Sequence, residues 1–246
     1  MKIKIAIVDS RISPEEERRL LILGYRVLTL PPFSRLSSAV ASHVDMLLTK
    51  IGDDYISYAD YCEEASYVFT DLSLLLRGSG AVFSFTADEA GSEYPNDCRL
   101  NALRMGNKLF CRTESASEYL IAAAKRSRLE IVSVKQGYPA CTVLKLSDTD
   151  AITADRGMAK VLTSHGIKVT LIENGSIALP PHEYGFIGGA GTVYDGNLYL
   201  LGNIELHPQS ELIKKATSSL GLGIISLSGE PLVDLGGIIF AEADVN

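Results

Sequence analysis

The residues of this sequence best suited to chemistry are one cysteine and one histidine–aspartate pair. Cys141 precedes an apolar run, and His43 and Asp45 flank Val44 at the start of another. A thiol with an ordinary pKa of about 8.5 is mostly protonated at neutral pH, and a nearby imidazolium or cationic substrate would lower that pKa and supply thiolate. The thiolate could attack an electron-poor carbon while His43 protonates the leaving group and then activates water. Cys141 and His43 are therefore candidate catalytic residues, and Asp45 is a candidate for orienting the cationic substrate or the histidine.

Each of these residues also has a purely structural explanation. A single Cys in Pro-Ala-Cys-Thr-Val is most often a small buried hydrophobic residue. His43 and Asp45 could cap a corner between a loop and a strand. Whether these residues meet depends on the elements that position them.

The segment from Tyr138 to Gly175 predicts the repeating element of the chain. Two short apolar runs, a helical segment that stops at His165-Gly166 and a third apolar run follow one another there, which predicts two strands, a helix and a strand. A unit of about forty residues cannot bury its sheet and its helix alone, so similar neighbours are expected. We identify five such units, at approximately residues 43–85, 99–134, 138–172, 184–227, and 232–240 together with 2–30.

The last of these units is split between the two ends of the chain. Residues 2–30 contain a strand, a helix that begins at Ser13-Pro14 and a second strand, and the lone strand 232–240 supplies the missing first strand. We therefore expect one domain over residues 1–246, an α/β propeller whose five ββαβ repeats close into a ring. The alternative is an ordinary open α/β sheet with alternating helices.

Composition excludes several classes of protein. The chain has 246 residues, of which 46% are hydrophobic, and a net charge of -7, which argues against a nucleic-acid surface. Only a short apolar run precedes Asp9, so we expect no signal peptide or membrane span and a cytoplasmic location. The four cysteines form no CxxC pair, the histidines show no metal-ligand spacing and no phosphate-binding glycine loop follows a strand, so we expect free thiols and no cofactor.

Five ββαβ repeats around an axis resemble the pentein fold of the guanidine-modifying enzyme superfamily, which includes arginine deiminases and dimethylarginine dimethylaminohydrolases. The sequence YGFIGGA at 184–190 resembles a functionally unassigned bacterial branch of it. The resemblance implies that a His-x-Asp segment, a nucleophilic cysteine and a Phe-Glu-Gly-Gly-Asp segment line a central pocket. His43-Val44-Asp45 matches the first, and Cys141 stands two units later at the place of the second.

The third segment departs from the pattern. Ile187 and Ala190 replace both of its acids, and guanidinium recognition depends on bidentate carboxylates, so a guanidine bound in the usual way is not expected. Candidate substrate-binding residues are Asp45, Asp234, Asp97, Gly188 and Gly189, although the glycines could instead serve close backbone approach.

The sequence thus favours a cysteine-dependent hydrolase or transferase that acts on a non-peptide C–N bond of a small cationic, amidine- or guanidine-like molecule. The alternative is a catalytically inactive pentein that binds a small ligand or a protein, as in the ribosome anti-association factor that resembles this ring. Cys141 and His43-Val44-Asp45 favour the first, and the two missing acids favour the second. We expect a small-molecule partner, no nucleic acid and no membrane.

Overall fold

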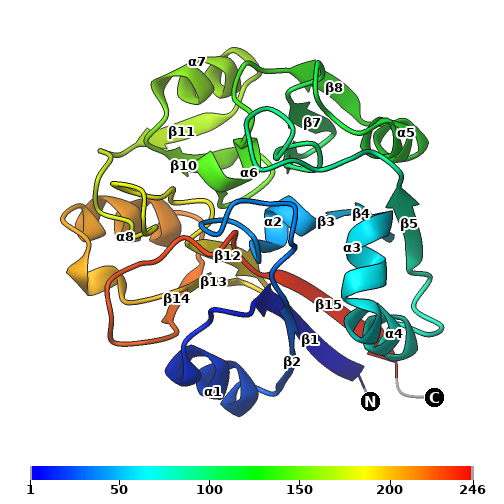
Figure 1. Ribbon diagram of the computed structural model, residues 1–246. Coiled ribbons are helices and arrows are strands. Elements are labelled where there is room, and N and C mark those ends of the chain that lie inside the picture. The colour runs from blue at the N-terminus through cyan, green and yellow to red at the C-terminus, as the bar shows by residue number, and fades with distance from the viewer. Residues whose placement is uncertain (1, 245–246) are drawn as a thin grey trace.

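Five three-stranded sheets surround a central axis in the computed structural model, which describes residues 2–244 (Figure 1). Residues 1, 245 and 246 of the expected domain lie outside this range. In every sheet the middle strand pairs antiparallel with one neighbour and parallel with the other. The helices α1, α4, α5, α7 and α8 lie on the outside of the ring in Figure 1, while the short α2 and α6 lie near its centre.

Each sheet is built from one repeat. The first contains β15 (Ile239–Asp244), β1 (Lys2–Asp9), α1 (Pro14–Ile22) and β2 (Tyr25–Leu30). The second contains α2 (Val44–Leu47), β3 (Leu48–Ile51), β4 (Asp54–Tyr58), α3 (Ala59–Glu64), α4 (Ser66–Leu75) and β5 (Val82–Thr86). The third contains β6 (Ala102–Met105), β7 (Lys108–Cys111), α5 (Glu118–Arg126) and β8 (Glu130–Ser133).

The remaining two sheets follow in chain order. The fourth contains α6 (Pro139–Thr142), β9 (Val143–Lys145), β10 (Asp150–Thr153), α7 (Arg156–Ser164) and β11 (Lys168–Leu171). The fifth contains β12 (Gly191–Tyr194), β13 (Asn197–Leu200), the 3-10 turn η1 (Ile204–Leu206), α8 (Ser210–Ser218) and β14 (Gly223–Ser226).

The first sheet joins the two ends of the described chain. β1 lies between β15 and β2, with Ile5 opposite Ala241 on one side and opposite Arg26 on the other. The prediction that the first and last strands share one sheet is confirmed. The predicted strand 232–240 is wrong in extent, because β15 begins only at Ile239. Gly236 and Gly237 have φ values of +73° and +71°, which no strand accommodates.

Local sequence signals account for the outer helices. Ser13 and Glu16 form a reciprocal capping box at the start of α1, and Pro14 occupies its first turn. The helix ends before Gly24, whose φ of +86° breaks the helical path. These contacts fix the first and last turns of α1.

The segments that carry the candidate catalytic residues are helical turns rather than strand starts. Residues 43–49 were expected to form a strand, yet the amide N–H groups of Met46 and Leu47 donate to the carbonyl of His43 before β3 begins. Cys141 lies in the equivalent turn α6, in which the N–H of Thr142 donates to the carbonyl of Tyr138. The expected strand from Tyr184 is also shortened to β12.

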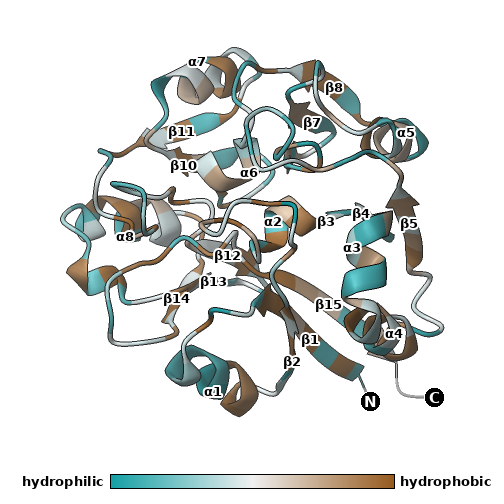
Figure 2. Cartoon of the chain, viewed as in Figure 1, coloured by the Kyte–Doolittle hydropathy of each residue, from teal (hydrophilic) through white to brown (hydrophobic). Residues whose placement is uncertain are grey.

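Apolar residues fill the spaces between the sheets and the outer helices. Figure 2 shows hydrophobic residues along β1 and β15 and hydrophilic ones on much of α1 and α3. The largest group of buried apolar side chains joins the first three sheets and includes Ile5, Leu47 and Ala241. No helix within residues 2–244 is long and apolar enough to cross a membrane.

Candidate functional site

One end of the ring axis opens into a cavity of about 590 Å³, here called the thiol cavity. Its wall includes Cys141 and His43 together with the acidic residues Asp97, Glu183 and Asp234, and no described Lys or Arg lines it. Cys141 and His43 are 98 residues apart in the chain yet share this wall because α2 and α6 both face the axis. The cavity therefore combines a thiol and an imidazole with a surplus of carboxylates.

Two side chains hold the thiol of Cys141. Its Sγ donates to Asp45 Oδ2 at 2.7 Å, and Asn101 Nδ2 donates to Sγ at 3.3 Å. Asn101 also accepts from the N–H of Ala140 through Oδ1 at 2.8 Å, which fixes the turn that carries the cysteine. Burial, followed by the negative charges of Asp45 and Asp234, raises the pKa of Cys141 well above its usual value. The resting group at neutral pH is a thiol that donates to a carboxylate.

Asp45 lies behind the thiol rather than beside the histidine. Burial raises its pKa to about 6; the charge of His43 opposes that rise and the charge of Asp234 adds to it. Its Oδ1 atom is shielded from solvent and has no hydrogen-bond partner among the described residues. The expectation that Asp45 orients the histidine is not what the contacts show, because its carboxylate accepts from Cys141.

His43 is fully buried between two carboxylates. Its Nδ1 lies 3.2 Å from Asp9 Oδ2 and its Nε2 lies 3.2 Å from Asp234 Oδ1. The second contact is too bent for a hydrogen bond, so Nε2 has no such partner within the described chain. Burial opposes the charge of the ring, but Asp234, Asp9 and the charge of Asp45 outweigh it and raise the pKa of His43 to about 9. The ring is an imidazolium at neutral pH.

Arg11 binds the same carboxylate, Asp9, that lies next to the ring of His43. Its guanidinium contacts Asp9 through Nε and Nη2, at 3.0 and 2.6 Å, and its Nη2 lies 2.7 Å from His43 Nδ1. Burial opposes the charge of Asp9, but its bonds to His43 and Arg11 hold the pKa of the carboxyl below its usual value. Asp9 therefore stays ionised and holds Nδ1, which leaves Nε2 as the ring atom free for chemistry.

Two backbone N–H groups bind the carboxylate of Asp234, and a neighbouring glycine leaves room for it. The N–H of Phe186 donates to its Oδ2 at 2.8 Å and that of Gly236 to its Oδ1 at 3.1 Å. A Cβ at Gly189 would collide with the same carboxylate, and one at Gly188 would collide with the carbonyl of Ala140. Neither Gly188 nor Gly189 lines the thiol cavity. These two glycines permit close backbone approach instead of contacting the contents of the cavity.

Asp97 is another acidic residue that lines the thiol cavity. Tyr138 donates to its Oδ2 through a hydroxyl at 2.6 Å, while its Oδ1 has no hydrogen-bond partner among the described residues. Burial raises the pKa of Asp97, and the bond from Tyr138 only partly offsets that rise. Tyr138 and Cys141 share one helical turn, so this contact also links Asp97 to the turn that carries Cys141.

Sequence reasoning missed three residues of the site. Asp9 is the last residue of β1, Arg11 follows that strand, and Asn101 precedes β6. Their position in the repeats could have indicated them. Polar residues at the strand ends near the axis of a ring are candidates for a site, as His43 and Asp45 were. The structure holds no group of three or more His, Cys, Asp or Glu side chains arranged to bind a metal, within residues 2–244.

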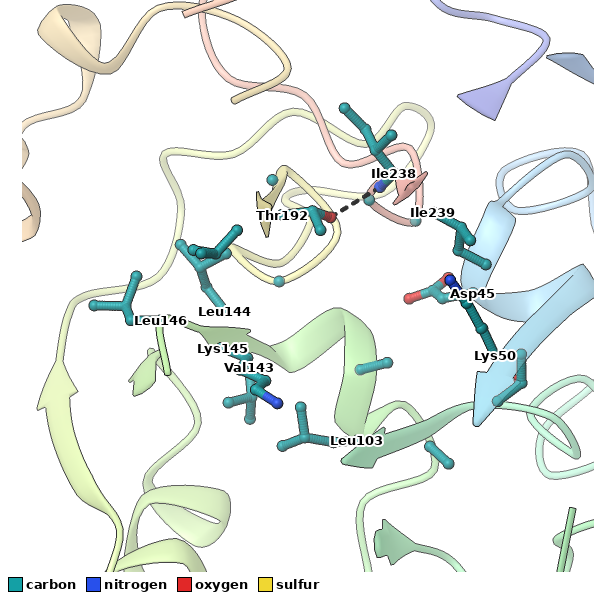
Figure 3. Close-up of a pocket in the computed structure, with 18 of the residues that line it drawn as sticks. Asp45, Lys50, Leu103, Val143, Leu144, Lys145, Leu146, Thr192, Ile238 and Ile239 are labelled. Atoms are coloured by element: carbon teal, nitrogen blue, oxygen red, sulfur yellow. Dashed lines mark hydrogen bonds between the residues drawn. The ribbon is translucent and has the colours of Figure 1, made fainter. Parts of the chain in front are cut away.

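A second cavity of about 380 Å³, here called the axial cavity, lies next to Asp45 (Figure 3). It is lined mainly by apolar residues such as Leu103, Leu144 and Ile239. Asp45 lines this cavity, whereas Cys141 does not. Figure 3 shows the carboxylate of Asp45 pointing into the space between the apolar side chains.

Comparison with solved structures places this architecture among known folds. A dimethylarginine dimethylaminohydrolase (DDAH) of Pseudomonas aeruginosa matches with a TM-score of 0.56 and 12% identity over 91% of this chain and 90% of that one. Agmatine deiminase of C. jejuni matches with a TM-score of 0.56 and 9% identity over 94% and 90%. The amidinotransferase SxtG of Microseira wollei matches with a TM-score of 0.53 and 12% identity over 91% and 88%.

These identities establish the fold alone, and they confirm the predicted pentein-type ring. No curated protein sequence matches the chain significantly. A family model does match, over residues 7–239, which span both Asp9 and Asp234. The chain therefore belongs to the family of unknown function DUF6873, with the pentein fold that it shares with guanidine-modifying hydrolases and transferases.

Proposed function

We propose that this protein is a cysteine-dependent hydrolase or transferase that breaks a C–N bond in a small cationic amidine- or guanidine-like molecule. The observation that carries the proposal is the shared wall of the thiol cavity, where Cys141, His43 and Asp234 meet. A reactive sulfur, a proton-bearing imidazole and an anionic surface are the three parts that such a reaction needs.

The charge of the cavity favours a cation as the substrate. Asp97, Glu183 and Asp234 line it without a Lys or Arg among the described residues, and only Asp234 lies next to the imidazolium of His43, so the lining disfavours an anionic molecule. A cation would also act on the nucleophile. The resting thiol of Cys141 has a raised pKa, and a positive charge next to the sulfur lowers it. A substrate that brings its own charge therefore activates the group that attacks it.

The covalent step assigns the imidazole the role of an acid. Sγ of Cys141 forms a bond to the amidine carbon, and the leaving amine takes a proton from Nε2 of His43 as its C–N bond breaks. The pKa of about 9 means that this proton is present at neutral pH. The neutral ring can then accept a proton from water, which gives hydrolysis, or from an acceptor amine, which gives transfer.

Related structures support the substrate class without establishing it. The DDAH of Pseudomonas aeruginosa is known in complex with citrulline, and a dimethylarginine dimethylaminohydrolase is known as an adduct with S-methyl-L-thiocitrulline. We extend to this chain only the general class, a small molecule with an amidine-type carbon. Ile187 and Ala190 are buried and apolar, so the acids of the relatives' Phe-Glu-Gly-Gly-Asp segment have no counterpart at these positions.

The apolar residues Ile187 and Ala190 favour a second candidate, a pentein that binds a cationic ligand without reacting with it. Asp234 and Asp97 would hold the ligand, and Cys141 would be an inert buried thiol. The two candidates differ in the reactivity of the sulfur.

A pair of alkylating reagents of equal size tests the proposal. Chloroacetamidine carries a positive charge and chloroacetamide does not, and mass spectrometry after digestion locates the label. We expect the cationic reagent to label Cys141 at least about tenfold faster at pH 7, because a neighbouring positive charge lowers the thiol pKa by about one unit or more. His43→Gln should slow turnover of any substrate later found, while Cys98→Ala, which removes a buried thiol outside the cavity wall, should leave the ratio unchanged. Equal labelling rates for the two reagents would reject the cationic substrate, and a Cys141 that neither reagent labels would leave only the binding candidate.

A further inference from the structure

The nucleophile and its hydrogen-bond partner face different compartments. Cys141 lines the thiol cavity and Asp45 lines the axial cavity, so the Sγ–Oδ2 contact of 2.7 Å forms part of the partition between the two. A substrate that fills the thiol cavity covers the sulfur from one side only. The carboxylate behind it stays next to the second space, as Figure 3 shows.

A thiol that forms a bond to carbon must lose its proton, and His43 is poorly suited to accept it. The ring already carries a proton on Nε2, which the proposed reaction gives to the leaving amine. One imidazole cannot hold that proton and accept a second one in the same step. The thiol proton therefore needs another acceptor.

The neighbours of the sulfur leave one such acceptor. Asn101 directs an amide N–H at Sγ and so only donates. Asp234 is occupied by the N–H groups of Phe186 and Gly236. Asp45 alone accepts the S–H, and its second oxygen has no partner within the described residues.

The surroundings of that second oxygen are kept open by a glycine. A Cβ at Gly236 would lie 2.6 Å from Asp45 Oδ1, and Gly236 has a φ of +73°. A buried carboxylate oxygen without a donor costs free energy, and a donor at this place would favour the charged carboxylate and weaken it as a base. The free oxygen keeps the group ready to take up a proton.

We propose that Asp45 is the general base that accepts the thiol proton of Cys141, with the axial cavity as the solvent compartment to which that proton returns. In balanced form, Sγ bonds to the amidine carbon as the C=N π pair moves onto nitrogen, the S–H proton moves to Oδ2, and the carboxylic acid then releases the proton to water on the axial side. This assignment rests on the proposed role of Cys141 as a nucleophile. It divides the work between Asp45 as base and His43 as acid.

The charges that face Asp45 set the pH at which it can act. Around the carboxylate itself these are His43, Asp234 and Cys141, and across the axial cavity they are Lys50, Lys145 and Asp148. The raised pKa of Asp45, about 6, leaves it ionised at neutral pH and a stronger base than an ordinary aspartate. It is thus able to accept a proton under the same conditions in which His43 can donate one.

The sign of one rate change tests this assignment, because two roles of Asp45 predict opposite effects. As a purely electrostatic neighbour, its negative charge raises the thiol pKa, so Asp45→Asn would speed alkylation. As the base, its loss slows alkylation. The measurement is the rate of Cys141 labelling by neutral chloroacetamide between pH 5 and pH 8, which requires no substrate binding.

We expect the unsubstituted protein to show a rate that rises as Asp45 ionises and then levels off by pH 7. Asp45→Asn should react at least about tenfold more slowly at pH 7, the lower end of what a general base contributes, with a rate that keeps rising with pH. Asp148→Asn, which removes an exposed carboxylate from the same cavity, should behave as the unsubstituted protein. Circular dichroism establishes that each variant is folded.

An unchanged or faster rate in Asp45→Asn would overturn the assignment. This result is independent of the test of the proposed function. A slower Asp45→Asn together with equal rates for charged and neutral reagents would retain the base and reject the cationic substrate. An unchanged or faster Asp45→Asn together with faster labelling by the charged reagent would retain the cationic substrate and reject Asp45 as the base.

Discussion

Replacing Asp45 by Asn should make the protein more stable at neutral pH, although Asp45 belongs to the candidate site. The carboxyl has a pKa of about 6 in the folded protein against an ordinary value of 3.8. A difference of about two units, at about 1.36 kcal/mol each, corresponds to about 3 kcal/mol that the ionised carboxylate costs the folded state. Asn has the same shape, can still accept the S–H of Cys141, and carries no charge, so we expect a gain of about 1–3 kcal/mol.

The sign and the pH window follow from the raised pKa. Because the folded state binds this proton more tightly than the unfolded state, the penalty is absent below about pH 3.8 and complete above about pH 6. The stability difference between Asp45→Asn and the unsubstituted protein should therefore open between pH 4 and pH 6 and stay constant to pH 7.5. Urea unfolding followed by circular dichroism measures it, since the chain has no Trp for fluorescence.

Asp148→Asn is the matched control for this measurement. Asp148 also lines the axial cavity, but its side chain is 69% exposed and pairs with Lys145, which holds its pKa below the usual value. A screened surface pair contributes little, so this variant should change stability by less than about 1 kcal/mol. An Asp45→Asn variant that is equally or less stable at pH 7, with a difference that does not vary between pH 4 and pH 6, would refute the reasoning.

Three further predictions concern the support of the site. Gly189→Ala forces a methyl group against Asp234 and should lower the free energy of unfolding by about 1–3 kcal/mol and slow Cys141 labelling, whereas Gly229→Ala, which meets nothing within 4 Å, should do neither. The pKa of His43 is about 9 in the folded protein against an ordinary value of 6.5, so the charged ring stabilises the fold fully below about pH 6.5 and this stabilisation is lost as pH rises through 9. Urea titrations should show the free energy of unfolding falling by up to about 3 kcal/mol over this range. His43→Gln should remove this pH dependence. Ser13→Ala removes the N-cap of α1 and should lower the free energy of unfolding by about 1 kcal/mol, measured by thermal unfolding, without changing the rate of Cys141 labelling. A changed labelling rate would contradict this and show that the end of α1 affects the site.

The ring could be predicted because its evidence is spread over the whole chain. Four complete units and a fifth that is split between the two ends of the chain required closure, and the pairing of β1 with β15 provides it. The bounds of that last strand could not be predicted, because apolar residues such as Leu232 and Val233 pack outside any named strand. Hydrophobic runs indicate burial, whereas the left-handed backbone at Gly236 and Gly237 depends on how Asp234 is held.

The site was only partly predictable for a related reason. The sequence indicates that Cys141, His43 and Asp234 converge, since each occupies a similar place in its repeat, and all three line one cavity. The direction of a side chain within a helical turn has no signal in composition, which is why Asp45 was expected to face the substrate or the histidine and not the sulfur. Asn101 was missed because its role depends on its contacts with Cys141 and Ala140, which the sequence does not indicate.

The pairing of β1 with β15 also sets an order of assembly for the proposed site. His43 lies between Asp9 and Asp234, which stand near opposite ends of the described chain. During translation β1 stays without its antiparallel partner until residues 239–244 leave the ribosome. A chain that stops before Asp234 lacks one of the two carboxylates around the imidazole, so we expect the proposed site to be incomplete in it.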